Sequence, residues 1–361
     1  MNKNRIHIFL FIILSAARSL SQDLHFSQFN ENHALINPAL TGATDPFRAS
    51  ISYRNQWRSI TTPFKTYGMS FETRFNTSNW KEVDKFRSMT FKERSISRLA
   101  WGLSVYSDKA GTGNLASTIA NLSLATFVPI NKKSFLAFGM QARYVQQKVD
   151  NKELIFSGQY NGYGYDPTMP SHERFASVNY NYFGFSGGGL WSYGQDQKRI
   201  ANNGQVKGNL GVSFYHLNPP HEGFYAGNQI TQMKYVVHGD LLYAPAEFNH
   251  AIAPSFLVQK QGSSLEILFG TMLRYYIADN SKYTGHVKRT SIGYGVYYRN
   301  SDAAIIALNF EKQEQYVIGL SYDVNISKLS NASQGRGALE ITLRYTPPKA
   351  FLYQKKAPVA K

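Results

Sequence analysis

Four groups of residues carry side chains that catalysis, metal binding or phosphate binding would use. They are His25 with Ser27, His216 with His221 and Glu222, His238 with Asp240, and the glycine run 187–189. A His–Ser pair needs an acidic or amide partner to orient the imidazole, and no such partner can be placed beside residues 25–27. The second group spans the Pro219–Pro220 turn and fits no common metal site.

The other two groups are weak candidates as well. His238 and Asp240 share one face of an expected strand, so a His–Asp dyad is conceivable, but a lone polar pair on an inward strand face is more often structural. The glycine run is not followed by the Gly-Lys-Ser/Thr sequence of a phosphate-binding loop. We therefore expect no enzyme activity, no metal site and no cofactor.

The composition narrows the class of protein. The 361 residues include no cysteine, which excludes disulfides, thiolate metal sites and a cysteine nucleophile. Charged residues make up only 17%, whereas Tyr and Phe number 24 each and Gly 28, a balance that favours an aromatic-rich all-β protein. Apolar residues reach 43% but form no long run beyond the first residues, so a helical-bundle membrane protein is excluded.

The first 21 residues have the pattern of a secretory signal peptide. Lys3 and Arg5 precede the apolar stretch 6–14, which is shorter than the ~20 residues that a spanning helix needs. Ser19 and Ser21 are small enough for a cleavage site, so we place the mature start at Gln22.

The mature chain consists of short segments in which apolar and polar residues alternate. This period of two is typical of strands with one buried or lipid-facing side and one polar side. The clear segments are 47–54, 67–75, 99–105, 136–144, 210–214, 265–273, 292–298, 316–323 and 339–345, and weaker ones lie at 115–128, 178–191, 233–243, 250–259 and 303–310. Together they predict about 14 strands.

The length of these strands distinguishes two all-β architectures. Strands of a soluble β-sandwich average ~5 to 6 residues, while strands that cross a bilayer need ~9 to 11. Several of the predicted strands have the longer length, so we expect a transmembrane antiparallel β-barrel of about 14 strands in a bacterial outer membrane. The apolar faces would meet lipid, and the Gly, Ser, Arg and Glu faces would line the interior.

The remaining segments complete the predicted domain organisation. It comprises a signal peptide at 1–21, an N-terminal plug or cap segment at 22–46, the barrel at 47–345, and a basic, proline-containing tail at 346–361. A plug segment would enter the lumen or cap its periplasmic mouth. Trp57 follows the first strand, and because aromatic rings favour the headgroup level we expect it at a membrane interface.

The segment Asn76–Ser97 is unusually long for its side of the barrel. If the chain starts in the periplasm, this segment also faces the periplasm, where turns are normally short. It combines acidic and basic residues with aromatic ones. The segment is therefore either a solvent-exposed loop or a docking surface for a periplasmic partner. The candidates for partner binding are Trp80, Phe86, Arg87, Phe91 and Arg94.

Several motifs resemble those of one protein family. The chain contains Asn37, Pro38 and Gly42 ahead of the run Tyr53-Arg54-Asn55-Gln56-Trp57, then Asp108 and Gly111, then Tyr298 and Arg299, and finally Tyr322 and Asp323 followed by Ser327. In this order they resemble the PorP/SprF family of type IX secretion system outer-membrane proteins. The tail beyond residue 345 extends past the family pattern.

The resemblance implies a barrel component of the type IX secretion and gliding apparatus that assists export or surface attachment of a partner protein such as a large adhesin. Outer-membrane lipid and other components of the machinery would be its partners. The net charge of +16 would suit anionic headgroups or an acidic protein, whereas an exported barrel does not meet nucleic acid. Two alternatives stay open. One is a FadL-like transporter of hydrophobic small molecules, which an apolar lumen would favour, and the other is a passive porin.

Overall fold

The computed structural model describes the parts of the chain that position the barrel and its contents. They are residues 24–57, 63–75, 80–86, 89–94, 98–111, 115–131, 133–149, 156–166, 168–170, 179–196, 205–220, 230–245, 247–278, 289–327, 335–347 and 353–355. No helix in these ranges is long and apolar enough to cross a membrane.

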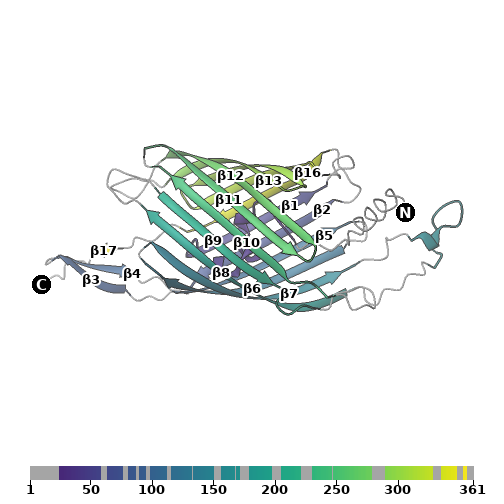
Figure 1. Ribbon diagram of the computed structural model, residues 1–361, viewed down its shortest axis with the longest axis horizontal. Coiled ribbons are helices and arrows are strands. Elements are labelled where there is room, and N and C mark those ends of the chain that lie inside the picture. The colour runs from purple at the N-terminus through teal and green to yellow at the C-terminus, as the bar shows by residue number, and fades with distance from the viewer. Residues whose placement is uncertain are drawn as a thin grey trace, which may run out of the picture.

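Fourteen antiparallel strands form a closed barrel (Figure 1). They are β1 Phe47–Gln56, β2 Phe64–Arg74, β5 Leu99–Ala110, β6 Leu115–Pro129, β7 Ser134–Lys148, β8 Asn179–Asp196, β9 Gln205–Tyr215, β10 Lys234–Ala244, β11 His250–Gln261, β12 Ser264–Ala278, β13 Thr290–Arg299, β14 Ala303–Lys312, β15 Tyr316–Asn325 and β16 Arg336–Tyr345. Pairing of β1 with β16 closes the ring, so the predicted fold class and strand number are confirmed.

Alternation along each strand separates a lipid-facing surface from a polar lumen. In β15 every second residue is exposed on the outside, from Tyr316 through Ile318 and Leu320, and the residues between them are buried. In β1, Ile51 points outward while Ser50 and Ser52 are buried on the inside. The predicted assignment of the two faces is therefore confirmed.

Aromatic side chains gather near both ends of the strands. We call the end at which β1 starts and β16 finishes the terminal end, and the opposite one the far end. Outward pairs at the terminal end include Tyr316–Tyr345, and those at the far end include Tyr53–Tyr67 and Phe214–Tyr235. Two such girdles around an apolar band match the two interfaces of a bilayer. Trp57 lies at the far end with its ring edge-on to Phe64 at 4.8 Å, and its depth in the membrane stays a prediction.

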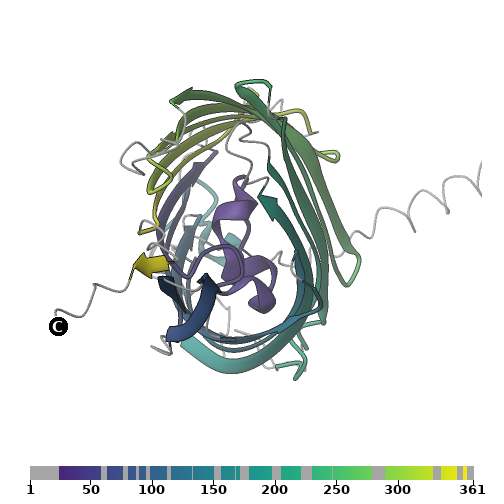
Figure 2. The same ribbon diagram turned by 90° about the vertical axis from the view of Figure 1, so that its left-hand side faces the viewer.

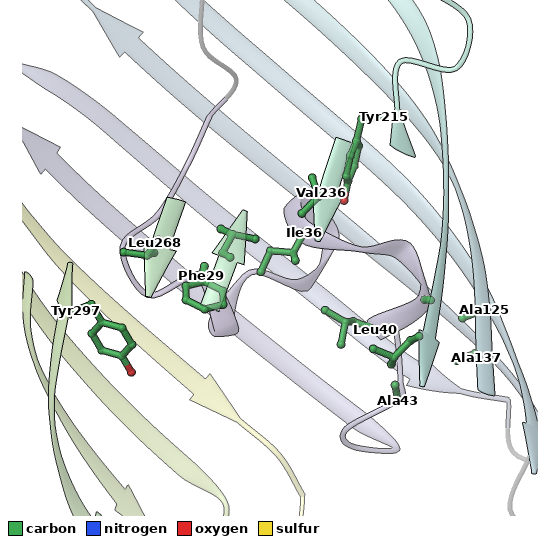
Figure 3. Packing of buried hydrophobic residues seen from close by; sticks show 14 of the residues in the cluster. Phe29, Ile36, Leu40, Ala43, Ala125, Ala137, Tyr215, Val236, Leu268 and Tyr297 are labelled. Atoms are coloured by element: carbon green, nitrogen blue, oxygen red, sulfur yellow. The ribbon is translucent and has the colours of Figure 1, made fainter. Parts of the chain in front are cut away.

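Residues 24–46 lie inside the barrel, and we call them the plug (Figure 2). The plug contains the 3-10 helices η1 Phe29–Glu31 and η2 Pro38–Leu40 and the short helix α2 His33–Ile36. Its apolar residues form a core with inward residues of the wall, as Figure 3 shows for Phe29, Ile36 and Leu40. The wall contributes Ala125, Ala137, Tyr215, Val236, Leu268 and Tyr297 to this core.

A second, smaller sheet is formed by segments outside the barrel. Strands β3 Trp80–Phe86 and β4 Met89–Arg94 make a hairpin within the long segment between β2 and β5, and β17 Tyr353–Lys355 pairs with β4. The strand order is β17-β4-β3, and we call this unit the terminal sheet. Figure 1 shows it beyond the terminal end of the barrel, so the C-terminal tail joins the segment for which docking was predicted.

A charge on the lipid face tests the orientation of the strands. Leu320→Arg, in the middle of β15, should destabilise the folded barrel by about 2 to 4 kcal/mol, because a cation at the bilayer midplane loses its hydration. Tyr316→Arg, at the terminal girdle of the same strand, should cost only about 0 to 1 kcal/mol for the charge itself. Urea titration of the heat-modifiable gel band in liposomes measures both. Equal costs at the two depths would contradict the orientation.

Candidate functional site

The start of the plug is held by a buried polar cluster near the far end. The Ser27 hydroxyl lies 2.7 and 2.8 Å from the two carboxylate oxygens of Asp323. The backbone N–H groups of Ser27 and Gln28 donate to the two oxygens of Glu340, at 2.8 and 3.0 Å. Two carboxylates on neighbouring strands therefore bind one short stretch of the plug.

Two arginines complete this cluster. Arg54 pairs with Asp323 at 3.0 Å and with Glu340 at 3.2 Å. Arg299 pairs with Asp323 at 3.3 Å and donates to the Ser27 hydroxyl at 2.8 Å. We call these residues, Ser27, Arg54, Arg299, Asp323 and Glu340, the Ser27 cluster. Its members are all buried, and their opposite charges compensate each other where isolated ions would be very costly.

A second group of ion pairs holds the plug at a point closer to the terminal end of the barrel. Glu31 accepts from Arg48 at 2.7 Å and from Arg344 at 3.2 Å, so one carboxylate joins β1, β16 and the plug. Burial alone would raise the pKa of Glu31, but the charges of Arg344 and Arg48 outweigh it and lower the pKa to about 2. Glu31 is therefore ionised at neutral pH.

A third contact uses a turn that only glycine fits. His33 Nδ1 lies 3.1 Å from Glu72, and the backbone N–H of Gly42 donates to the same carboxylate at 3.1 Å. Gly42 has a φ of +68°, and a Cβ there would lie 2.7 Å from the Cβ of Ala100. The glycine thus lets the plug turn against the wall while it binds Glu72.

Asn37 attaches the middle of the plug to β8, β9 and β10. Its Oδ1 accepts from the N–H of Ala39 and caps η2, while its Nδ2 donates to the carbonyls of Gly189 and Val212 at 3.0 and 3.2 Å. His238 Nε2 lies 3.1 Å from the same amide nitrogen. A Cβ on Gly188 would lie 2.1 Å from Asn37 Oδ1, so this glycine makes room for the plug.

The candidate catalytic groups have structural partners in this arrangement. Ser27 belongs to the Ser27 cluster, and His238 contacts Asn37, whereas Asp240 accepts from Asn209 at 3.0 Å. His216 is buried. His221 and Glu222 lie outside the described residues.

The residues of the family motifs fall into three locations. Asn37, Pro38 and Gly42 belong to the plug, and Arg54, Arg299 and Asp323 belong to the Ser27 cluster. The others lie at or near the far end: Tyr53, Asn55, Gln56, Trp57, Asp108, Gly111, Tyr298, Tyr322 and Ser327. Among these, Asn55 donates to the Tyr53 hydroxyl at 3.2 Å, and Gln56 accepts from Arg54 at 3.3 Å.

The predicted partner-binding residues lie in the terminal sheet. Trp80 and Phe86 are on β3, and Phe91 and Arg94 are on β4. Arg87 lies outside the described residues. The structure therefore brings four of the five candidates into one hairpin.

Comparison with known families identifies the chain. The sequence profile described as "Type IX secretion system membrane protein PorP/SprF" matches residues 19–345. The chain belongs to the PorP/SprF family. This PorP/SprF protein is accordingly an outer-membrane barrel, as predicted from its motifs. No match is found among curated proteins.

Solved structures similar to this PorP/SprF protein are also barrels. The KdgM porin in complex with disordered oligogalacturonate is 9% identical, with a TM-score of 0.35, over 83% of this chain and 99% of the porin. A deletion mutant of TodX, a monoaromatic hydrocarbon channel, is 9% identical, with a TM-score of 0.41, over 90% and 94% of the two chains. CdiB from Escherichia coli is 10% identical, with a TM-score of 0.42, over 83% and 63%. The similarity is limited to barrel architecture.

Sequence reasoning missed the contacts that hold the plug. The sequence pattern suggests a nucleophile at Ser27 and places Ser27 and Glu340 within the family motifs, but it indicates no partner for these residues or for Glu31. One signal was present, because Arg48, Arg54, Glu72, Glu340 and Arg344 all occupy inward positions of predicted strands. Charges that face a barrel interior need partners, and an N-terminal segment placed inside the lumen can provide them.

The adjacent glycines of β8 allow a matched test of the Asn37 contact. Gly188→Ala should displace Asn37 and destabilise the barrel by about 1 to 3 kcal/mol, because buried polar groups lose their hydrogen bonds. Gly187→Ala is the control, since a Cβ there meets its nearest atoms only at 3.8 Å. Thermal unfolding followed by gel mobility measures both variants. Equal losses would show that the contact of Asn37 with β8 does not hold the plug.

The Glu31 contact predicts a specific acid sensitivity. The folded-state pKa of about 2 is below the ordinary value of 4.5, so the stabilisation is present above pH 4.5 and is lost as the pH falls towards 2. The shift corresponds to about 3 kcal/mol. The difference in unfolding free energy between the native protein and Glu31→Gln should therefore shrink between pH 5 and pH 2. A difference that does not change with pH would contradict this role of Glu31.

Proposed function

We propose that this PorP/SprF protein is a component of the type IX secretion and gliding apparatus that assists export or surface attachment of a partner protein such as an adhesin. Family membership supports the general assignment. The observation that carries the specific proposal is the terminal sheet, in which the long segment between β2 and β5 and the C-terminal tail combine into one structure beyond the barrel. We propose that this sheet docks another component of the machinery.

The lumen supports a scaffold role more than a transport role. Ion pairs, backbone hydrogen bonds and an apolar core tie the plug to strands around the ring. Besides the wall residues of the apolar core, many inward side chains near the plug are polar or charged, including Arg48, Ser50, Arg54, Glu72 and Gln141. A transporter of hydrophobic molecules would favour an apolar lumen, and a passive porin would favour an open one. No catalytic role is proposed for the barrel.

The architecture of the terminal sheet suits partner binding. Within the described residues, β3 pairs only with β4, and the row of N–H and C=O groups on its other edge is a template for an added strand. The hairpin also carries both signs of charge and three aromatic residues, which are common at protein interfaces. Barrels with an even number of strands usually have both chain ends in the periplasm, and the terminal sheet lies at the end of the barrel where β1 starts and β16 finishes, so we expect it to face the periplasm.

Replacing residues 77–96 by a short Asn-Gly turn tests the docking proposal. The variant should keep its heat-modifiable migration, because the lipid-facing strands are untouched. Affinity purification from outer membranes should recover the other secretion components at least several-fold less well, and secretion of the cognate surface protein should fall. The control replaces residues 151–177, which lie in sequence between β7 and β8, by the same turn.

Two cysteine variants establish the orientation in the same cells. The native chain has no cysteine, so Gln313→Cys reports the terminal end and Ser301→Cys reports the far end. A membrane-impermeant maleimide should label only the far-end variant in intact cells. Labelling of the terminal end from outside, or undiminished recovery of the machinery after removal of the hairpin, would refute docking of a periplasmic partner at this sheet.

A further inference from the structure

A row of lysines crosses the outer surface of the barrel at the far end. Lys65 of β2 lies directly opposite Lys109 of β5. Lys109 lies opposite Ala116 of β6, and Ala116 lies opposite Lys148 of β7. All three lysines are exposed. We call Lys65, Lys109 and Lys148 the lysine row.

Alternation along the strands places the lysine row on the outer face. Each lysine is separated by an even number of residues from an exposed apolar residue of its own strand, namely Met69, Val105 or Met140, and side chains at even spacing share a face. The neighbouring carboxylate of Asp108 lies on the inner face, where it accepts from the hydroxyl of Thr66. No ion pair joins the lysine row to another residue that the structure describes.

The lysine row lies just outside the aromatic girdle of the far end. On the same face of β1 and β2, the pair Ile51–Met69 lies deepest in the membrane, and Tyr53–Tyr67 is the next pair towards the far end. Lys65 follows Tyr67 after two residues, which is about 7 Å along the strand. Tyrosine rings favour the headgroup level, so the ammonium groups reach the charged outer part of the headgroups.

The charge of the lysine row is local. At the terminal end, β5 and β6 present the apolar residues Leu99 and Val128 on the outside. On the opposite wall, an outward row at the far end consists of Tyr298, Ala304 and Val324. Neither set of residues carries a charge, so the net charge of +16 does not by itself explain why three lysines are aligned here.

The spacing of the lysine row indicates what would neutralise it. Like charges directly opposite each other destabilise a sheet, and the Cβ atoms of such a pair, here Lys65 and Lys109, are about 5 Å apart. One phosphate between the two ammonium groups removes this repulsion, since lysine binds phosphate as a point charge. Lys148 is two strand spacings, or about 10 Å, from Lys109, which places it beyond the reach of the same phosphate.

We propose that the lysine row binds the headgroup of a phosphorylated glycolipid in the outer leaflet. One phosphate lies between Lys65 and Lys109, and a second lies at Lys148. A glycerophospholipid with a single phosphate cannot occupy both positions, whereas a disaccharide headgroup with a phosphate at each end can. The hydrocarbon chains of the lipid lie against the apolar outer face of β2, β5, β6 and β7. This site does not depend on the docking role of the terminal sheet.

Native mass spectrometry of the full-length protein in detergent tests the site, because it counts the bound lipids. The probes are diphosphoryl lipid A, its monophosphoryl form and phosphatidylglycerol. Diphosphoryl lipid A should bind about fivefold more tightly than the other two, because one lysine near an anionic group contributes about that factor. Inorganic pyrophosphate at the same concentration should not displace it, because the hydrocarbon chains hold the lipid on the barrel.

Matched lysine variants separate the row from the general charge of the far end. Replacing Lys65 and Lys109 together by Gln should weaken binding of diphosphoryl lipid A roughly 25-fold, and replacing both by Arg should preserve it. Lys148→Gln should abolish the preference for two phosphates over one. Lys260→Gln is the control, because Lys260 is also exposed on the outer face at the far end but lies opposite uncharged residues, Tyr235 and Leu265. Heat-modifiable migration confirms that each variant is folded.

Four results would overturn the proposal. They are an equal loss of binding in Lys260→Gln, equally tight binding of phosphatidylglycerol, a preference for two phosphates that survives Lys148→Gln, and displacement of the lipid by pyrophosphate. The first two would reduce the row to unspecific attraction of anionic lipid. The third would remove the second phosphate position, and the fourth would make free phosphate the ligand.

Discussion

Backbone hydrogen bonding inside the bilayer is the constraint on which this structure depends. Water is absent from the hydrocarbon region, so each strand must pair on both sides, and only a closed ring satisfies the first and last strands together. The pairing of β1 with β16 provides that closure. A ring of eight strands is narrow enough for its own side chains to fill, but one of fourteen is wider. The plug occupies that additional interior space, and its helices contribute Phe29, Ile36 and Leu40 to a core that the wall alone does not form.

Placing a polypeptide inside the ring determines which charges the wall carries. The plug brings its own backbone N–H groups, its carboxylate Glu31 and its hydroxyl Ser27 into a space closed to most water. Each of them meets an inward side chain of opposite character, such as Arg48 for Glu31 and Glu340 for the N–H of Ser27. Removing one partner of a buried pair leaves an uncompensated charge at a cost of about 3 to 5 kcal/mol, so these contacts specify one position of the plug. A rigid, occupied barrel suits a scaffold for other proteins better than an open conduit.

The sequence was sufficient to predict the barrel because the alternation that indicates each strand is a local pattern. Alternation within each segment, as in Tyr316 to Asp323, reports the two faces of one strand without any knowledge of its neighbours. Contacts between distant residues leave no such signal: Ser27 meets Asp323 across almost 300 positions, and the tail at 353–355 pairs with β4 across about 260. Gly188 illustrates the same limit, since its small size is explained only by Asn37, which comes from another part of the chain. The charged inward positions indicated that partners were needed, but not which residues would provide them.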